Sequence, residues 1–268
     1  MSDSTILHGI ILSAVPIGEY DRRVLILTRE RGKISAFAKG AQRPKSALIS
    51  AAQPFVTGAF HLIEGRSAYT MIRADVDNYF SEYRADAEKT FLGIYFCEIA
   101  EYMTEEDNDE RATLVLLYRA LQALGHSGIG LALARVVFEL KMLWIGGIGP
   151  QVSACVRCGD REGPFVLHVP SGGCLCRRCA GNFFDEAGRK EMEVRTQIVA
   201  TGYRNLEDST WFALRFIAAT PPKDLYSFAV SDTVLAELRA VSEDWYREYV
   251  GHEFRSAEMV TAMEGVSE

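Results

Sequence analysis

The sequence RVLILTRERGKISAFA, residues 23–38, decides the fold of the first part of the chain. Residues 23–28 form a short, largely apolar run, as expected for a buried β-strand. Residues 29–32 read as a tight turn, and Gly32 suits the positive φ that such turns require. Residues 33–38 alternate with a period of two, which is typical of a half-buried strand. The stretch therefore predicts a β-hairpin.

Similar strand patterns surround this hairpin. Ile6–Val15 is rich in β-branched residues and ends at Pro16, and the patterns of Phe55–Ile63 and Ala68–Val76 predict another pair of strands. Four or five short strands within about 75 residues favour a small closed barrel.

After Tyr83 the apolar period changes from two to about 3.6, which predicts helices. The acidic run 105–110 interrupts them, and we expect it to be a solvated loop. Leu131–Trp144 is apolar on most faces and so predicts a buried central helix. Helices are also expected at Met192–Leu206, at Trp211–Ala219 and at Ser231–Val250, the last with Ser231 as N-cap and Gly251 just beyond its end. The expected fold class is α+β, with more than one domain.

The composition is that of a globular protein. Of 268 residues, 48% are hydrophobic and 24% charged. No apolar run approaches the roughly 18–20 residues that span a bilayer. The first residues lack the basic and apolar regions of a secretory signal, so we expect a cytoplasmic protein.

The net charge of −7 argues weakly against a nucleic-acid partner, but the charge is unevenly distributed. Residues 22–45 contain eight Lys or Arg and one acid, a net charge of +7, so the remaining residues sum to −14. Such a basic stripe favours contact with a polyanion, although a merely solvated surface is the alternative. Its candidate nucleic-acid-binding residues are Arg22, Arg23, Lys33, Lys39, Arg43 and Lys45. Phe37 could stack on a base, but a core position is preferred.

Five of the six cysteines fall within residues 155–179. Two Cys-x-x-Cys pairs, Cys155 with Cys158 and Cys176 with Cys179, have the spacing of a ribbon-type zinc site. One structural Zn²⁺ is expected; another metal, redox use or free thiols are the alternatives. Cys174 would then be a spare thiol beside the site, and His168 a strand residue rather than a ligand.

An enzyme is not expected. Four cysteinates would close the coordination shell, whereas a catalytic zinc needs an open position. A zinc deaminase would also need a His-x-Glu ahead of a Pro-Cys-x-x-Cys, and no such pair is present.

These features, in this order, resemble the RecO family. The resemblance is carried by Val24-Leu25-x-Leu27-Thr28, Gly32-Lys33-Ile34-Ser35, Ala38-Lys39-Gly40-Ala41, Gln53-Pro54-Phe55, Phe138-Glu139-Leu140-x-x-Leu143-x-x-x-Gly147, Cys155-x-x-Cys158-Gly159 and Gly172-Gly173-x-x-Cys176-x-x-Cys179. It extends over nearly the whole chain. The acidity of the chain departs from what a DNA-binding family leads us to expect.

The resemblance implies an N-terminal oligonucleotide-binding (OB-fold) barrel and an α-helical domain with an inserted zinc ribbon. The expected segments are a barrel at 1–80, a first helical part at 81–150, the ribbon at 151–182 and a second helical part at 183–268. The family's role implies a nucleoid-associated protein that binds single- and double-stranded DNA and anneals complementary strands. It also implies binding to RecR and to the C-terminal tail of the single-stranded-DNA-binding protein, and assistance in loading RecA.

The tail-binding pocket of the family lies among the helices, where a cation would pair with the terminal carboxylate. Arg135 and Lys141, on the third expected helix, are the candidates. Two alternatives to this function stay open. One is an adaptor whose barrel and ribbon bind RNA or protein, and the other is a zinc hydrolase or deaminase.

Overall fold

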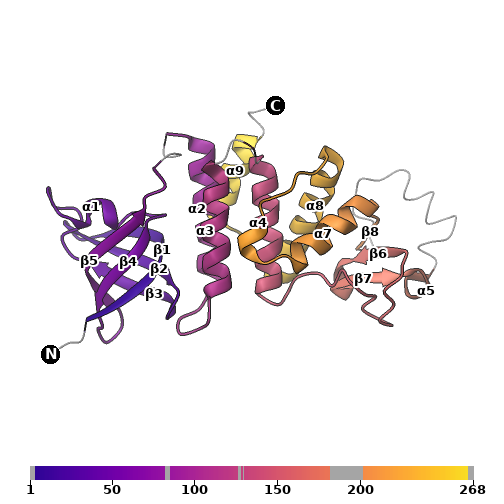
Figure 1. Cartoon of the computed structure of the whole chain (residues 1–268), viewed down its shortest axis with the longest axis horizontal. Coiled ribbons are helices and arrows are strands. Elements are labelled where there is room, and N and C mark those ends of the chain that lie inside the picture. The colour runs from indigo at the N-terminus through magenta and orange to yellow at the C-terminus, as the bar shows by residue number, and fades with distance from the viewer. Residues whose placement is uncertain (1–3, 82–84, 126–127, 129, 182–201, 265–268) are drawn as a thin grey trace. The chain divides into compact units, whose positions relative to one another are not determined.

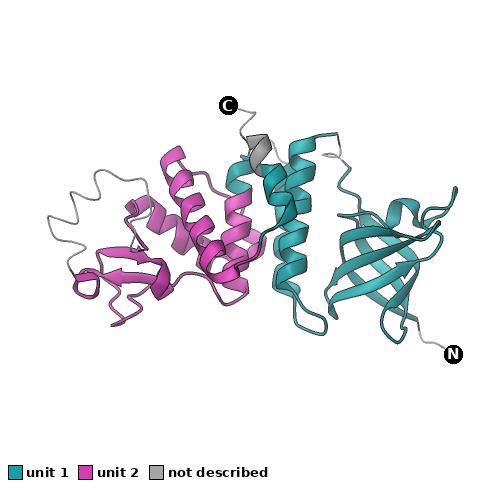
Figure 2. Ribbon diagram, turned by 180° about the vertical axis from the view of Figure 1, so that it is seen from behind, with its two compact units in different colours: residues 1–134, 253–268 teal, residues 135–252 magenta. Residues whose placement is uncertain are grey.

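The computed structural model describes residues 4–81, 85–125, 128, 130–181 and 202–264 (Figure 1). The described residues divide into two compact units (Figure 2). Unit 1 comprises residues 1–134 and 253–268, and unit 2 comprises residues 135–252.

Unit 1 begins with a closed barrel of five strands in the order β1-β2-β3-β5-β4, in which β4 pairs back onto β1. All pairings are antiparallel except β3 with β5. Its elements are β1 (Ser4–Ile17), β2 (Asp21–Thr28), β3 (Gly32–Ala38), the short helix α1 (Leu48–Ala51), β4 (Thr57–Ile63) and β5 (Tyr69–Asn78). The barrel expected from sequence is thus present.

The barrel closes because alternate residues of each strand are apolar and point inward. The side chains of Ile11, Ile26 and Phe60 are fully buried in this core. The turn between β2 and β3 has Gly32 at φ +61°, as the sequence predicted. A Cβ at Gly32 would lie 2.4 Å from the carbonyl oxygen of Glu105, so only glycine fits there.

The helical part of unit 1 contains α2 (Ala87–Met103), α3 (Arg111–Gly125) and α9 (Arg255–Glu264). Helix α2 begins at Asp86, whose carboxylate accepts a hydrogen bond from the amide of Lys89 at 3.2 Å. Helix α9 is tied to α2 because the Glu98 carboxylate accepts hydrogen bonds from the amides of Arg255 and Ser256 at 3.0 Å.

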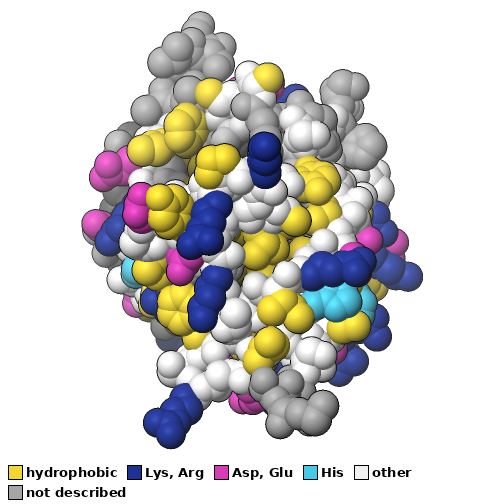
Figure 3. Space-filling model, turned by 90° about the vertical axis from the view of Figure 1, so that its left-hand side faces the viewer, with side chains coloured by type: hydrophobic (Ala, Val, Ile, Leu, Met, Phe, Trp, Pro, Cys, Tyr) yellow, Lys and Arg dark blue, Asp and Glu magenta, His cyan; other side chains and the backbone are white. Residues whose placement is uncertain are grey.

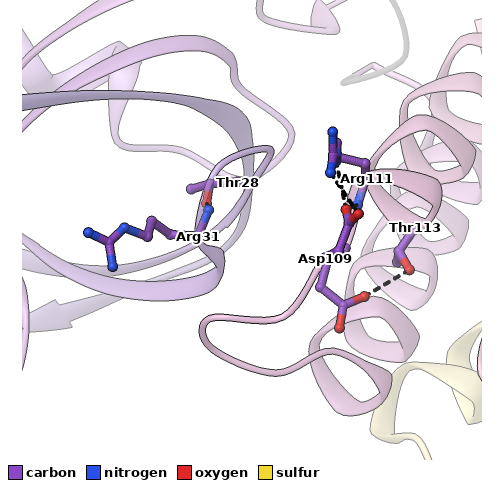
Figure 4. A network of polar contacts seen from close by, with 6 residues as sticks. Thr28, Arg31, Asp109, Arg111 and Thr113 are labelled. Atoms are coloured by element: carbon purple, nitrogen blue, oxygen red, sulfur yellow. Dashed lines mark hydrogen bonds and ion pairs between the residues drawn. The ribbon is translucent and has the colours of Figure 1, made fainter.

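The acidic loop between α2 and α3 is exposed at residues 105–109, as expected from sequence, and it also contacts the barrel of the same unit. The amide of Lys33 donates to Glu105 O and the amide of Asp107 donates to Arg31 O, both at 3.0 Å. The Arg111 guanidinium binds both carboxylate oxygens of Asp109 at 2.7 Å (Figure 4). The loop therefore fastens the β2–β3 turn to the helices of the same unit.

Unit 2 contains most of α4 (Leu131–Ile145), which is buried as expected. A three-stranded sheet follows, in the order β7-β6-β8. Its elements, with the neighbouring helices, are β6 (Phe165–His168), β7 (Gly173–Cys176), α5 (Arg177–Ala180), β8 (Tyr203–Arg204), α7 (Asp208–Ala219) and α8 (Asp232–Trp245). The helix expected at Met192–Leu206 lies mostly outside the described residues, and residues 203–204 form β8 instead.

Helix α8 begins as predicted, with the Ser231 hydroxyl accepting a hydrogen bond from the amide of Val234 at 3.3 Å. It continues into a π-helical turn, Tyr246–Val250, and Gly251 ends it in the left-handed conformation. No helix in the described part of the chain has the length and apolarity needed to cross a membrane.

Candidate nucleic-acid interface and metal centre

One outer face of the barrel carries exposed cations beside apolar side chains (Figure 3). Register pairing places Val15, Arg23 and Phe37 side by side across β1, β2 and β3. Val15 is 58% exposed, and Arg23 is exposed with its Nε donating to Ser35 Oγ at 2.9 Å. Lys39, Arg43 and Lys45 follow in the loop after β3, and all three are exposed. We call this surface, residues 15, 20, 23, 37, 39, 43 and 45, the barrel face.

The loop of the barrel face is held in place by the β1–β2 turn. The amide of Gly40 donates to the Asp21 carboxylate at 2.7 Å, and the amide of Gln42 donates to Tyr20 O at 2.8 Å. The Arg43 guanidinium lies 5.0 Å from the centre of the Tyr20 ring, within the range of a cation–π contact. The cations are therefore positioned by hydrogen bonds within the barrel.

Phe37 corrects the expectation of a core position. Its neighbours Ala36 and Ala38 are fully buried in the barrel, whereas Phe37 is half-buried on the opposite, outer side of β3. The alternation of residues 33–38 already contained this signal, because it places Phe37 on the same side as Lys33 and Ser35. An aromatic ring thus lies beside Arg23 on the barrel face.

Two of the six candidate DNA contacts are occupied by the protein itself. The Arg22 side chain is half-buried, and its Nη1 donates to Ala52 O at 2.9 Å. The Lys33 ammonium donates to Glu101 O in the last turn of α2, where a cation complements the helix dipole. These contacts give Arg22 and Lys33 structural roles, so the exposed members of the six candidates are Arg23, Lys39, Arg43 and Lys45.

In unit 2, the four predicted ligands come together. The Sγ atoms of Cys155, Cys158, Cys176 and Cys179 all lie within 4.8 Å of one another, so they could hold a metal ion. The Cys158 and Cys176 sulfurs are 3.6 Å apart. Gly159, at φ +76°, turns the chain after the first pair, and its amide donates to Cys155 O at 2.9 Å. The second pair spans the end of β7 and the short helix α5.

Backbone amides around the first pair favour the thiolate form, which is the form that binds metal. Burial raises the pKa of Cys155, but hydrogen bonds from the amides of Cys176, Arg157 and Cys158 outweigh it and bring this pKa to about 6. The amide of Asp160 and the guanidinium of Arg178 hold the pKa of Cys158 below its usual value.

Cys174 and His168 lie beside this cluster, outside the set of four. Cys174 is fully buried, its Sγ donates to Ala154 O at 3.1 Å, and burial raises its pKa to about 11. His168 ends β6, and its Nδ1 is 2.6 Å from Ser171 Oγ. Both positions agree with the expectations of a spare thiol and a strand residue.

Contacts that the sequence analysis missed fasten the cysteine-bearing sheet to the helices of unit 2. Arg204 on β8 forms an ion pair with Asp244 on α8 at 2.6 Å, with the two side chains 15% and 5% exposed. Arg215 on α7 donates to Val152 O at 2.9 Å, and the Tyr249 hydroxyl donates to Val169 O at 2.6 Å. The partners are 40 to 80 residues apart, so no local pattern could reveal them.

The side chains of both candidates for tail binding, Arg135 and Lys141, already form contacts within unit 2. The Lys141 ammonium donates to the carbonyls of Ile217, Ala218 and Thr220 at 2.8–3.0 Å, at the end of α7. All three of its donors are used there, so none is left for a carboxylate. Arg135 pairs with Glu139 at 2.8 Å and is 15% exposed. Both cations are therefore engaged within unit 2 in this structure.

Comparisons with known proteins agree over nearly the whole length of the chain. The family model "Recombination protein O N terminal" matches residues 1–80, and "Recombination protein O C terminal" matches residues 84–196. A DNA repair protein RecO of Alkaliphilus metalliredigens is 34% identical over 175 residues, which cover 65% of this chain and 71% of the relative. That of Acetivibrio thermocellus is 29% identical over 96% of both chains, and that of Bacillus subtilis is 27% identical over 97% of this chain and 94% of the relative. The chain therefore belongs to the RecO family.

Proposed function

We propose that this protein is a non-enzymatic mediator of recombinational DNA repair that binds and anneals single-stranded DNA. The observation that carries the proposal is the barrel face, where exposed cations stand beside Phe37 and Tyr20 on a closed five-stranded barrel. The names of the relatives, which are DNA repair proteins, support it. We assign the barrel to the OB-fold class, which binds single strands by a cationic groove with aromatic stacking.

Annealing needs little chemistry. Two complementary strands repel each other through their phosphates, and Arg23, Lys39, Arg43 and Lys45 would offset that repulsion from one side of each backbone. Contacts of this kind do not read the sequence of the bases, so the base edges stay available for pairing. The same phosphate contacts would also bind double-stranded DNA, where stacking of bases on aromatic side chains contributes less.

The four-cysteine cluster is proposed to hold one structural Zn²⁺, and residues 151–182 to form a zinc ribbon. Four thiolates complete a tetrahedral shell, in which the ion cross-links the two Cys-x-x-Cys turns and has no position for a substrate. This donor set supports a protein without an active site. The division into segments 1–80, 81–150, 151–182 and 183–268 is part of the same proposal.

The proposed partners are RecR, the single-stranded-DNA-binding protein and, functionally, RecA. Because the proposed substrate is chromosomal DNA, we expect the protein in the cytoplasm, associated with the nucleoid. The position of the pocket for the tail of the single-stranded-DNA-binding protein is not assigned, since Lys141 has all its donors engaged.

Salt dependence tests the DNA interface. A variant with Arg23→Gln, Lys39→Gln, Arg43→Gln and Lys45→Gly removes the four exposed cations, and glycine suits position 45 because Lys45 has φ +67°. The slope of log affinity against log salt concentration is negative. Its magnitude should fall by roughly 0.7 per lost phosphate contact on single-stranded DNA, or about 3 in all.

The matched control is Lys223→Gln, which removes a lysine of unit 2 that is 66% exposed and should leave the slope unchanged. An unaltered slope in the fourfold variant would exclude the barrel face as the DNA site. Equal or tighter binding of RNA of the same sequence would favour the adaptor instead.

A further inference from the structure

A second surface, in unit 2, has the opposite charge and a well-formed hollow. The hollow has a volume of about 670 Å³ and lies at the start of α7, against the segment before β6. Its lining includes Glu162, Phe165, Glu207, Asp208, Trp211 and Phe212. We call it the α7 hollow. Neither the barrel face nor the cysteine cluster includes any of these residues.

The wall of the α7 hollow is apolar and held in place. The rings of Phe165 and Trp211 lie 6.1 Å apart and are 9% and 6% exposed. The Arg215 guanidinium lies 5.6 Å from the centre of the Phe165 ring and 5.9 Å from that of Trp211. Its Nε donates a hydrogen bond to Val152 O, which holds the guanidinium in place against the two rings. A wall of this kind is preformed for binding, which lowers the entropic cost of association.

Phe212 is the exposed part of this surface. It is 73% exposed, the largest exposed fraction among the large hydrophobic side chains of the described residues. A single exposed apolar side chain needs no explanation, but an aromatic ring next to a hollow is the usual arrangement of a binding hot spot.

The rim of the α7 hollow is acidic. Glu162, Glu207 and Asp208 are all exposed, against the single cation Arg215. Within the described residues, none of these three carboxylates forms an ion pair. The rim therefore has a net charge of −2 and repels phosphate, so a nucleic acid does not fit it.

We propose that the α7 hollow binds a short segment of a partner protein in which Lys or Arg flanks a large apolar side chain. The apolar side chain lies against Trp211 and Phe212, and the cations pair with the carboxylates of the rim. We infer a cationic partner from charge complementarity, because the net negative charge of the rim repels an acidic segment.

Peptide binding to the full-length protein tests the proposal. The probes are two labelled pentapeptides with blocked ends, Lys-Leu-Arg-Phe-Lys and Glu-Leu-Glu-Phe-Glu, titrated by fluorescence anisotropy. The cationic peptide should bind at least about tenfold more tightly than the acidic one, and added salt should weaken it. Phe212→Ala should lower its affinity about tenfold, the loss typical of truncating a central aromatic contact.

Two controls match these changes. Met259→Ala truncates an apolar side chain of α9 that is 52% exposed, and should leave the affinity unchanged. Glu207→Gln with Asp208→Asn should weaken the cationic peptide and flatten its salt dependence, whereas Asp224→Asn, which removes an exposed carboxylate elsewhere in unit 2, should do neither. Phe212 is exposed, so its truncation should not disturb folding, and thermal unfolding verifies this.

Three results would overturn the inference. The first is equal affinity for the two peptides, or wild-type affinity in Phe212→Ala. The second is a loss of DNA binding in Phe212→Ala, which would make the hollow part of the nucleic-acid surface. The third is self-association that Phe212→Ala abolishes, which would assign the hollow to a second copy of the chain. Because DNA binding is measured separately, failure here leaves the proposed function standing.

Discussion

Phe37 allows a test of whether the barrel face stacks bases or binds DNA by charge alone. It is half-buried on the outer side of β3, beside Arg23. Stacking of a base on an aromatic ring contributes about 1–3 kcal/mol. We expect Phe37→Ala to weaken binding of a short oligo-dT by about five- to a hundredfold, and Phe37→Trp to retain it, as measured by anisotropy at fixed salt. Wild-type affinity in Phe37→Ala would show that no base lies there.

Lys141 is a residue whose charge serves folding. Its ammonium binds three carbonyls at the end of α7, and burial lowers its pKa. Lys141→Met keeps most of the stem but leaves those carbonyls without a donor, which should cost about 2–4 kcal/mol in the free energy of unfolding. Urea unfolding measures the loss, and Lys223→Met, at an exposed position, is the control. Equal stability of the two variants would contradict the capping role.

At the scale of elements, the two Cys-x-x-Cys turns are expected to depend on the metal. Cys158 is exposed, so Cys158→Ser removes a ligand without opening a cavity in the core. We expect this variant to lose bound zinc and to unfold the β6–β7 ribbon at a lower temperature, because metal binding and folding are coupled in such sites. Zinc per chain is measured by elemental analysis.

Cys174→Ala is the matched control for this prediction. Cys174 lies on the same strand as Cys176 but outside the set of four sulfurs. Its replacement should cost some stability through packing and still leave one zinc per chain. The ligand assignment is wrong if Cys174→Ala loses the metal and Cys158→Ser keeps it.

The sequence predicts elements well where the signal is local. The hairpin around Gly32, the N-cap Ser231 and the terminating Gly251 follow from turn and capping chemistry, and all three are confirmed. The π-helical turn after α8 could not be predicted, because it accompanies long-range bonds such as that of the Tyr246 hydroxyl to Glu139 O. The two-residue strand β8 is also too short for any pattern to predict.

The difference between local and long-range contacts also explains how much of each candidate site could be predicted. The clustering of the four cysteines is predicted, because two Cys-x-x-Cys pairs at this separation are typical of a shared metal site. The basic stripe is predicted only in part. Whether a cation is exposed depends on which distant carbonyl it meets, as Arg22 does at Ala52 and Lys33 at Glu101. Charge can be read from a sequence, but availability to a ligand cannot.

At the scale of the whole molecule, the barrel face and the cysteine cluster belong to different compact units. Contributions from sites without shared partners usually add independently. We therefore expect Cys158→Ser to bind single-stranded DNA within about twofold of the wild type, at a temperature where unit 1 stays folded. Anisotropy with the same oligonucleotide measures this, and a large loss would mean that the cluster supports the DNA interface directly.

The closure of the barrel bears on how neighbouring molecules could contact one another along a DNA strand. An open sheet ends in a row of unpaired amides and carbonyls, to which another polypeptide can add a strand and from which aggregation can spread. Here β4 returns to β1, so the five strands of the barrel form a ring without such a border. If several molecules bind along one polynucleotide, we expect their barrels to contact one another through side chains and to separate again when the strand is withdrawn.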